Sequence, residues 1–294
     1  MTRHVQSILD LFAELGYNPR DRVRIGPSAL LHAWDDAGMA HDHIEFETDV
    51  FSPSGLTLLV DGTAQSHVDP DDPTRLFFEY ARRIGHVLDA MKLPGEPLRV
   101  LHLGGGAMTL PRYVEATRPD SRQVVVELDR EMLAVVLARL PLPSSADIEI
   151  IVGDAASVVG ELAARDEVDA FDVVVVDLYT RLDAPAFVDT PGFMAGCLRL
   201  VAPGGVLVAN VADAAGLTRL RAQTGAVARA APSAELLVAG DPSALSGAEE
   251  GNAVLVAAPA GAPVDLVRRL LEHGPHPAEV LEGPQLDFVL WGAC

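Results

Sequence analysis

The stretch between residues 98 and 129 constrains the fold of this chain more than any other feature. An apolar strand is followed by three glycines, a helix-like segment and a second apolar strand that ends in an acid; the glycines are Gly104, Gly105 and Gly106, and the acid is Glu127. Glycine suits this turn because a side chain would keep the backbone away from a nucleotide-like ligand. Glu127 lies 21 residues after Gly106, close to the spacing at which such an acid reaches a ribose. This order of elements predicts a nucleoside-cofactor site.

Two further acids directly follow apolar strands. Asp154 comes shortly after a strand predicted over 148–152, and Asp177 follows a strand predicted over 171–176. The carboxyl ends of parallel strands meet at one edge of a sheet, where ligands of open α/β sheets bind. One acid at such a position is often only the N-cap of the next helix. Three acids at one edge, Glu127, Asp154 and Asp177, are less easily explained as caps, and they predict that this edge binds a nucleoside.

The pattern of apolar residues divides the chain into three parts. Residues 1–43 contain one amphipathic helical pattern and otherwise have an unclear role. In residues 44–70, apolar residues recur at every second position in short runs that are separated by turn signals. Residues 71–294 alternate between strand and helix patterns, with a loop expected over 240–251. We therefore expect an α/β fold, in which a small antiparallel β unit precedes a mostly parallel sheet covered on both faces. His102, in the first strand of that sheet, is expected to be a buried, hydrogen-bonded core residue.

Charge and composition narrow the range of partners. The 294 residues carry a formal charge of −20, and 49% of them are hydrophobic. Nucleic acid and anionic membrane need a basic face, so we expect neither as a partner. No apolar run approaches the roughly 20 residues that span a bilayer, and the N-terminus lacks a signal-peptide core, so the cytoplasm is the expected location. The acidic surface would attract a cationic substrate, although solubility explains it equally well.

The rarity of lysine and cysteine excludes other kinds of site. Lys92 is the only lysine, which excludes a phosphate-binding loop of the Gly-Lys-Thr type and disfavours Schiff-base chemistry. Cys197 and Cys294 are the only cysteines, too few for a disulfide framework or a cysteine zinc site. The histidines in 41–43 and 273–276 lack both cysteine partners and the helical spacing of a metal site. We expect no bound metal.

Residues 44–211 resemble the spermidine synthase (polyamine aminopropyltransferase) family, a branch of the S-adenosylmethionine-dependent methyltransferase fold. The resemblance rests on segments in the family's order and spacing: 58–65, 103–106, 126–129, 152–155 and 171–177. It implies a methyltransferase-type Rossmann-like sheet of seven strands behind the β unit. It also implies a transferase that uses an adenosyl-sulfonium co-substrate, S-adenosylmethionine or its decarboxylated form, with no tightly bound cofactor. The acceptor would be a small amine, and we expect a homodimer.

The resemblance also implies roles for single residues. The positions to which it assigns donor binding are Gln65, Gly104, Gly105, Gly106, Glu127, Asp154 and Ala155. Within this set Gln65 would lie near the aminopropyl or methionyl arm, Glu127 would hold the ribose and Asp154 the adenine amino group. Asp177 would face the reacting centre, where a carboxylate orients an ammonium and accepts its proton. Tyr179, beside it, is a second catalytic candidate, with simple packing as the alternative.

Departures from the family pattern concern the amine-binding positions. Ala107 stands where the family has an aspartate that binds the donor amine, and Thr180 stands where it has a second aspartate near the reacting centre. Asp183 could replace that aspartate only in a rearranged loop. Phe77 replaces the tyrosine of the acceptor pocket. Because an unpaired buried ammonium is costly, we expect putrescine to be a poor acceptor.

The sequence leaves other functions open. Without the aspartate at Ala107, Arg112 could pair with the carboxylate of S-adenosylmethionine and so favour methyl or 3-amino-3-carboxypropyl transfer, or it could be a solvated helix residue. A methyltransferase and a non-catalytic homologue, which binds a nucleoside or dimerises through the β unit, are the alternatives. A dinucleotide dehydrogenase fits less well, because Thr109 replaces the third glycine of its motif and Asp154 and Asp177 would have no role.

Overall fold

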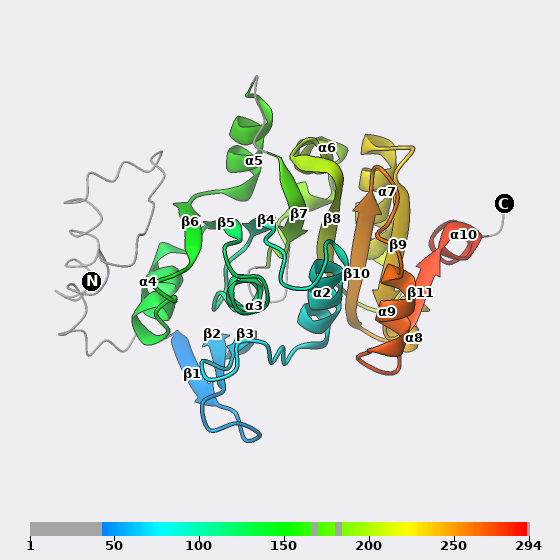
Figure 1. The fold of residues 1–294 in the computed structure, drawn as a ribbon. Coiled ribbons are helices and arrows are strands. Elements are labelled where there is room, and N and C mark those ends of the chain that lie inside the picture. The colour runs from blue at the N-terminus through cyan, green and yellow to red at the C-terminus, as the bar shows by residue number, and fades with distance from the viewer. Residues whose placement is uncertain (1–42, 166–169, 180–183, 293–294) are drawn as a thin grey trace.

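A computed structural model describes residues 43–165, 170–179 and 184–292 of the chain (Figure 1). The expectations for residues 1–42, Thr180, Asp183 and Cys294 lie outside these ranges. None of the helices in the described ranges is long and apolar enough to cross a membrane.

The main sheet consists of eight strands. They are β4 (Arg99–Leu103), β5 (Arg122–Glu127), β6 (Asp147–Val152), β7 (Phe171–Val176), β8 (Val201–Asp213), β9 (Glu235–Gly240), β10 (Gly251–Ala258) and β11 (Glu279–Glu282). Their order is β11-β9-β10-β8-β7-β4-β5-β6. The five strands from β8 to β6 are parallel, whereas β10 is antiparallel to both β8 and β9, and β11 is antiparallel to β9. The predicted α/β class with a mostly parallel sheet is confirmed.

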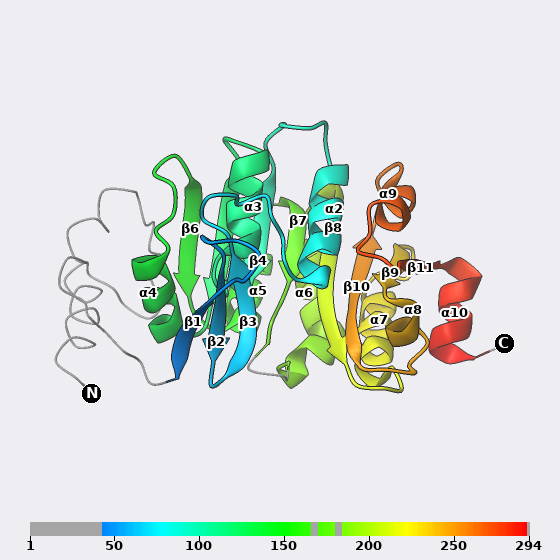
Figure 2. The ribbon, with the colours of Figure 1, turned by 90° about the horizontal axis from the view of Figure 1, so that it is seen from below.

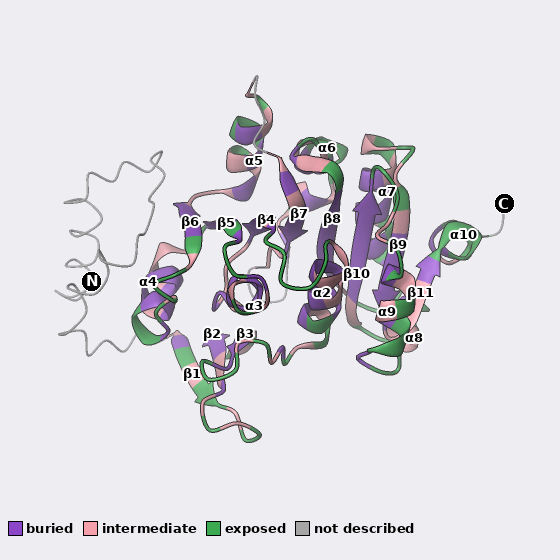
Figure 3. Cartoon of the chain, viewed as in Figure 1, coloured by how far each residue is buried: buried purple, intermediate pink, exposed green. Residues whose placement is uncertain are grey.

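Apolar residues on both faces of the strands explain why this sheet lies inside the molecule. Consecutive residues of a strand point to opposite faces, and β7 supplies Val174 and Val176 to one buried cluster and Val173 and Val175 to another. Strands that are apolar at every position must be covered on both sides. Figure 3 shows the central strands as buried along most of their length, with exposed residues on the surrounding helices and turns.

Helices cover each face of the sheet. One face carries α2 (Glu79–Ala90), α3 (Thr109–Thr117), α4 (Arg130–Arg139) and α9 (Leu266–Glu272). The other carries α5 (Ala155–Ala163), the short η1 (Ala186–Asp189), α6 (Pro191–Arg199), α7 (Thr218–Ala230), α8 (Pro242–Leu245) and α10 (Gly283–Trp291). In Figure 1, α5 and α6 lie above the strands and α3 and α4 below them, and Figure 2 looks onto the face that carries α2 and α3.

A separate three-stranded antiparallel sheet precedes the main one, as predicted. It consists of β1 (Ile44–Thr48), β2 (Leu56–Val60) and β3 (Thr63–Val68), in that order. Asp61 and Gly62 have positive φ angles of 49° and 74°, the conformation of the tight turn that an Asp-Gly pair predicts. Leu58 packs with residues of α4 in one core cluster. Because this sheet shares a core with the main unit, a domain boundary near residue 70 stays a prediction.

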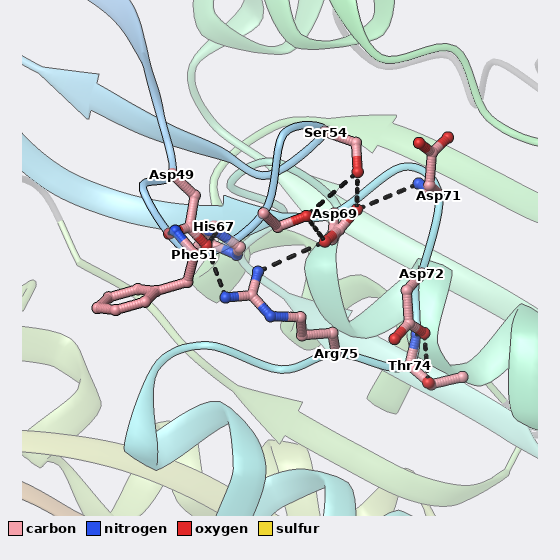
Figure 4. Close-up of polar contacts among 10 residues, drawn as sticks. Asp49, Phe51, Ser54, His67, Asp69, Asp71, Asp72, Thr74 and Arg75 are labelled. Carbon is pink, nitrogen blue, oxygen red and sulfur yellow. Dashed lines mark hydrogen bonds and ion pairs between the residues drawn. The ribbon is translucent and has the colours of Figure 1, made fainter.

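A polar cluster joins the β1–β2 loop to the segment that leads into α2 (Figure 4). It comprises Asp49, Ser52, Ser54, His67, Asp69 and Arg75. Arg75 lies 2.7 Å from Asp49 and 3.4 Å from Asp69, while Ser52 and Ser54 donate to the two oxygens of Asp69 at 2.6 and 2.5 Å. Both carboxylates are only 3% exposed, so their buried charges are compensated within the cluster.

The structure differs from the sequence expectations at four places. The sheet has an eighth strand, β11, which a run of only four residues did not reveal. The Asp72-Pro73 pair predicts an N-cap and a helix from residue 73, but α2 starts at Glu79, because the Asp72 carboxylate accepts from Thr74 and forms a turn there. Residues 240–251 contain α8, which Asp241 caps. The Pro203-Gly204-Gly205 sequence predicts a turn before a strand, but these residues form a bulge within β8, between Val201 and Val206, which pair with Phe171 and Val173 of β7.

The prediction of a core histidine at position 102 is confirmed. His102 is 1% exposed, and its Nε2 lies 2.9 Å from Oε1 of Gln123, whose own amide nitrogen donates to Pro111. Nε2 therefore carries the proton, and the buried Nδ1 has no hydrogen-bond partner. Burial lowers the pKa of His102 from 6.5 to about 4, because a second proton would leave a charged ring in an apolar layer.

We predict that His102→Gln flattens the pH dependence of folding stability. In the unfolded chain the imidazole titrates near 6.5, and in the folded chain at about 4, so protons favour unfolding between these values. The stability of the native protein should therefore fall by about 1.4 kcal/mol per pH unit below pH 6.5 because of this group alone. Urea unfolding of the variant between pH 7 and 4 should lack this part of the slope. Identical slopes would contradict the assignment.

Candidate nucleoside-binding and catalytic site

Main-chain hydrogen bonds hold the glycine turn between three strands. Gly104 N–H donates to the carbonyl of Val126 on β5 at 2.8 Å, and Asp177 N–H, after β7, donates to the carbonyl of Leu103 at 2.8 Å. Gly104 has φ +97°, and a Cβ atom there would overlap the carbonyl oxygen of Asp177. Only glycine combines that dihedral with that contact. The turn thus brings the ends of β4, β5 and β7 to one point at the carboxyl edge of the sheet.

The Glu127 carboxylate is fixed by backbone amides at this point. Its Oε2 accepts from Gly105 N–H at 2.9 Å and its Oε1 from Asp129 N–H at 2.8 Å. Burial raises the pKa of Glu127, while these amide bonds act in the opposite direction. A carboxylate oxygen has room for a second donor beyond the one it holds. The group is therefore oriented in advance to receive two adjacent hydroxyl groups, such as those of a ribose.

Asp177 is held from two sides. Asn210 Nδ2 on β8 donates to its Oδ1 at 2.8 Å, and the Tyr80 hydroxyl at the start of α2 donates to the same carboxylate. Burial raises the pKa of Asp177 against the effect of these two bonds, and the negative charge of Glu127 raises it further. A carboxylate with a raised pKa at the carboxyl edge of the sheet is suited to accept a proton.

Tyr179 bonds to the main chain of β8. Its hydroxyl donates to the carbonyl of Asn210 at 2.9 Å and accepts from the N–H of Ala212. The phenolic proton is thus already used, and burial raises the pKa of Tyr179. A direct catalytic role for this residue stays a prediction, and the observed contacts make it a clamp on the strand that carries Asn210.

Strand β3 crosses over the glycine turn. Ser66 Oγ lies 2.8 Å from Oγ1 of Thr109, and a Cβ atom on Gly106 would lie 3.1 Å from the same Ser66 oxygen. Thr109 also donates to the carbonyl of His67 at 2.8 Å. Gln65, the half-buried neighbour of Ser66 on this strand, therefore comes from the element that covers the turn.

Asp154 and Ala155 lie at the same edge but in a different role. The Asp154 Oδ1 atom accepts from Ser157 N–H at 2.8 Å and Ser157 Oγ at 2.9 Å, which makes Asp154 the N-cap of α5. Ala155 is buried in the core cluster on that face. Asp154 therefore has a different structural role from Glu127. A contact of Asp154 with an adenine stays a prediction. No three His, Cys, Asp or Glu residues in the described ranges are arranged to hold a metal ion.

Arg112 does not have either of the roles that the sequence suggested. It is buried, and its guanidinium donates to the carbonyls of Ala107 at 3.3 Å, Pro141 at 3.0 Å and Leu140. Burial lowers its pKa to about 10. The side chain joins the start of α3 to the end of α4, so it is neither a solvated helix residue nor a free cation for a donor carboxylate. The sequence could not reveal this, because all three acceptors are main-chain atoms.

Three residues of the site were missed by sequence reasoning. Tyr80 was taken only as an inward residue of a helix and Asn210 as a member of an apolar strand over 206–211, whereas Asn252 lay just before the strand expected over 253–257. Asn252 Nδ2 donates to Asn210 Oδ1 at 2.9 Å, and Asn210 in turn contacts Asp177. An asparagine within a fully buried strand is a signal that could have been used, because a buried amide requires partners.

The fold and the site were then compared with known proteins. A scan against models of protein families finds no match. A structure of human methyltransferase-like protein 13 is similar in fold, with a TM-score of 0.51, 19% identity and coverage of 67% of this chain and 89% of that one. The chain therefore has a methyltransferase-like fold.

Two further proteins have higher sequence identity to this chain, and both are named as polyamine-synthesising transferases. A crystal structure of a probable spermidine synthase from Corynebacterium glutamicum has a TM-score of 0.74 and 29% identity, and the match covers 85% of this chain and 91% of that one. A polyamine aminopropyltransferase of Chromobacterium violaceum is 29% identical over 149 residues, which are 50% of this chain and 54% of the relative. The chain spans about half the length of the curated relatives it matches. Within the methyltransferase-like fold, the chain is thus similar to spermidine synthases and polyamine aminopropyltransferases.

We predict that Gly104→Ala removes nucleoside binding and destabilises the fold. A matched control is Gly95→Ala, because Gly95 has a similar φ of +81° but open space around its Cβ position. The control should cost about 1–2 kcal/mol of backbone strain, and Gly104→Ala a further 1–3 kcal/mol or so from the overlap with Asp177. Chemical denaturation measures both, and equal losses would contradict the close contact.

We predict that Arg112→Met destabilises the protein without weakening donor binding. The loss of three donors to buried carbonyls should cost about 2–4 kcal/mol. Arg122→Met is the control, because Arg122 pairs with Asp147 at an exposed site and should change stability by less than about 1 kcal/mol. Thermal unfolding and calorimetric titration of the folded variants provide the two readouts. A clear loss of affinity for S-adenosylmethionine would restore the donor-carboxylate hypothesis.

Proposed function

We propose that this protein is a spermidine synthase-like transferase that moves an aminopropyl-type group from an adenosyl-sulfonium donor to a small amine. The observation that carries the proposal is the pairing of two differently held carboxylates across one glycine turn. Glu127 is held by amide donors next to Gly105, and Asp177 adjoins Gly104 through its carbonyl. One acid is oriented to bind a nucleoside, and the other is placed to act on the acceptor.

The chemistry assigned to Asp177 is proton acceptance. The acceptor amine attacks the donor carbon that is bonded to the sulfonium, the carbon–sulfur bond breaks, and its electron pair makes sulfur a neutral thioether. The nitrogen must lose a proton, and the Asp177 carboxylate lies at the strand end where this proton can be taken up. A pKa raised by burial and by Glu127 brings the group closer to the range that favours this transfer.

Similarity to known proteins supports the same reaction class. The curated relative from Chromobacterium violaceum is named a polyamine aminopropyltransferase and the Corynebacterium glutamicum structure a probable spermidine synthase. Among the candidate donors, the decarboxylated form is favoured, because Arg112 is buried and directed at three main-chain carbonyls and not toward a donor carboxylate. Methyl transfer from S-adenosylmethionine is the alternative that the experiment below separates.

The acceptor amine is proposed to lie between Asp177 and α2. The Tyr80 hydroxyl contacts Asp177 from that helix. The sequence did not suggest this contact, because Phe77 stands where the family has its acceptor-pocket tyrosine. The neutral donors around Asp177 leave its charge available to one ammonium group. We expect a monoamine or an amine with a neutral far end to be preferred over putrescine. A homodimer and a cytoplasmic location stay predictions.

We predict that calorimetric titration separates the donor site from the catalytic group. The ligands are S-adenosylmethionine, its decarboxylated form, methylthioadenosine and NAD, and we expect tightest binding of the decarboxylated donor and methylthioadenosine. Glu127→Gln should weaken their binding by about tenfold or more, since a hydrogen bond to a charged group contributes about 1.5–3 kcal/mol. Asp177→Asn should leave affinity nearly unchanged and lower kcat by about 10²–10⁴.

Asp129→Asn is the matched control for Glu127→Gln. Asp129 is the N-cap of α4, a position where asparagine and aspartate are equivalent, so neither affinity nor kcat should change. Tighter binding of S-adenosylmethionine with transfer of its methyl group would overturn aminopropyl transfer. If the purified protein bound none of the four ligands, the proposed enzyme would be abandoned altogether.

A further inference from the structure

The Asp177 carboxylate lies at the end of a chain of side-chain amides that crosses two strands. Asn252 Nδ2 on β10 donates to Asn210 Oδ1 on β8 at 2.9 Å, and Asn210 Nδ2 donates to Asp177 Oδ1 at 2.8 Å. Asn210 pairs with Val254 in the antiparallel register of these strands. Asn252 is therefore its diagonal neighbour on the same face of the sheet.

The direction of this chain is fixed by the chemistry of its last member. An ionised carboxylate only accepts hydrogen bonds, so Asn210 must turn its NH2 group toward Asp177. The amide oxygen then points away and needs a donor of its own, which Asn252 supplies. With the amide reversed, the oxygen of Asn210 would face the carboxylate and its NH2 would face another donor.

The position of Asn210 is fixed as well as its direction. Its carbonyl accepts from the Tyr179 hydroxyl, which also receives the N–H of Ala212, so the main chain of β8 is held on both sides of residue 211. The residue is 5% exposed, and bulk water therefore does not compete for its amide. Tyr179 is thereby linked to the site through the main chain of Asn210.

We propose that Asn210 is the positioning residue for the Asp177 carboxylate, and that Asn252 sets which end of the Asn210 amide faces it. This inference rests on the proposed function, in which Asp177 accepts a proton from an amine. An amide suits the task because it donates a hydrogen bond and carries no charge. A lysine or arginine there would neutralise Asp177 and repel the ammonium group that must approach it.

The hydrogen bond from Asn210 to Asp177 opposes the groups around it that favour protonation of the carboxylate. Burial and the charge of Glu127 on β5 disfavour the ionised carboxylate, whereas Tyr80 on α2 and Asn210 on β8 favour it. Tyr179, two residues along the chain, is neutral under ordinary conditions because burial raises its pKa. Asn210 and Tyr80 are thus the two donors that keep Asp177 able to accept a proton.

The first test replaces the donor. Asn210→Leu removes the contact at nearly constant volume, and it should raise the pKa of Asp177 by about one to two units, since a hydrogen bond to a charged group is of that strength. Carbon-13 NMR of the carboxyl carbon, assigned by comparison with Asp177→Asn, measures this pKa in the intact protein without any turnover. In the active enzyme the acid limb of kcat against pH should move upward by the same amount, with KM for the donor unchanged.

The second test reverses the direction of the amide. Asn252→Asp places a carboxylate against Asn210, which should turn its NH2 group toward residue 252 and its oxygen toward Asp177. The pKa of Asp177 should then rise by at least about one unit, and Asn252→Leu, which removes the donor without adding a charge, should cause a smaller rise. In the Asn210→Leu background, Asn252→Asp should retain only the small direct effect of its charge.

The outcomes are distinct. An unchanged pKa in folded Asn210→Leu, or an equal effect of Asn252→Asp in both backgrounds, would overturn the inference. If Asn210→Leu does not fold, Asn252→Asp and Asn252→Leu decide, and equal pKa values in these two variants would overturn it. The pKa shifts without aminopropyl transfer by the native protein would leave this inference standing and refute the proposed function. Transfer with no pKa shift in either variant would do the reverse.

Discussion

The close contact between the backbone of Gly104 and the carbonyl of Asp177 is the constraint on which the site depends. It brings the ends of β4 and β7 nearer than any side chain would allow, and the hydrogen bond from Gly104 to Val126 adds β5. Since all of these contacts are between main-chain atoms, the positions of Glu127 and Asp177 follow from the sheet itself. Functional groups carried by rigid strands in this way need little reorganisation when a ligand binds.

Acids at the same sheet edge have acquired different properties from their surroundings. Asp129 and Asp154 each cap the helix that follows them, and this requires only a side-chain oxygen that accepts a hydrogen bond near a helix start. Glu127 and Asp177 instead lie in desolvated positions in which burial raises the pKa. Position in the sheet is therefore not sufficient to identify a functional acid, whereas the partners of its oxygens are.

The sequence predicted the elements that depend on local patterns. The Asp61-Gly62 hairpin, the apolar parallel strands and the buried His102 follow from residue type and spacing, and they are confirmed. The same reasoning was wrong for Arg112, because its partners are main-chain carbonyls, two of them at the end of α4. It also missed Asn210 and Asn252, which meet only through the pairing of β8 with β10. Contacts of this kind depend on register between distant strands, and no local pattern encodes that register.

The insertion of β10 between β8 and β9 has a consequence for how the protein is made. Asn252 contacts Asn210 only when β10, which follows β8 and β9 in the chain, lies between them in the sheet (Figure 1). During synthesis the nucleoside half, formed by residues up to Asp177, can assemble first, while the amide chain stays incomplete. Because β10 follows the other contributors to the site in the chain, the amide contact to Asp177 is complete only after β10 has paired with β8.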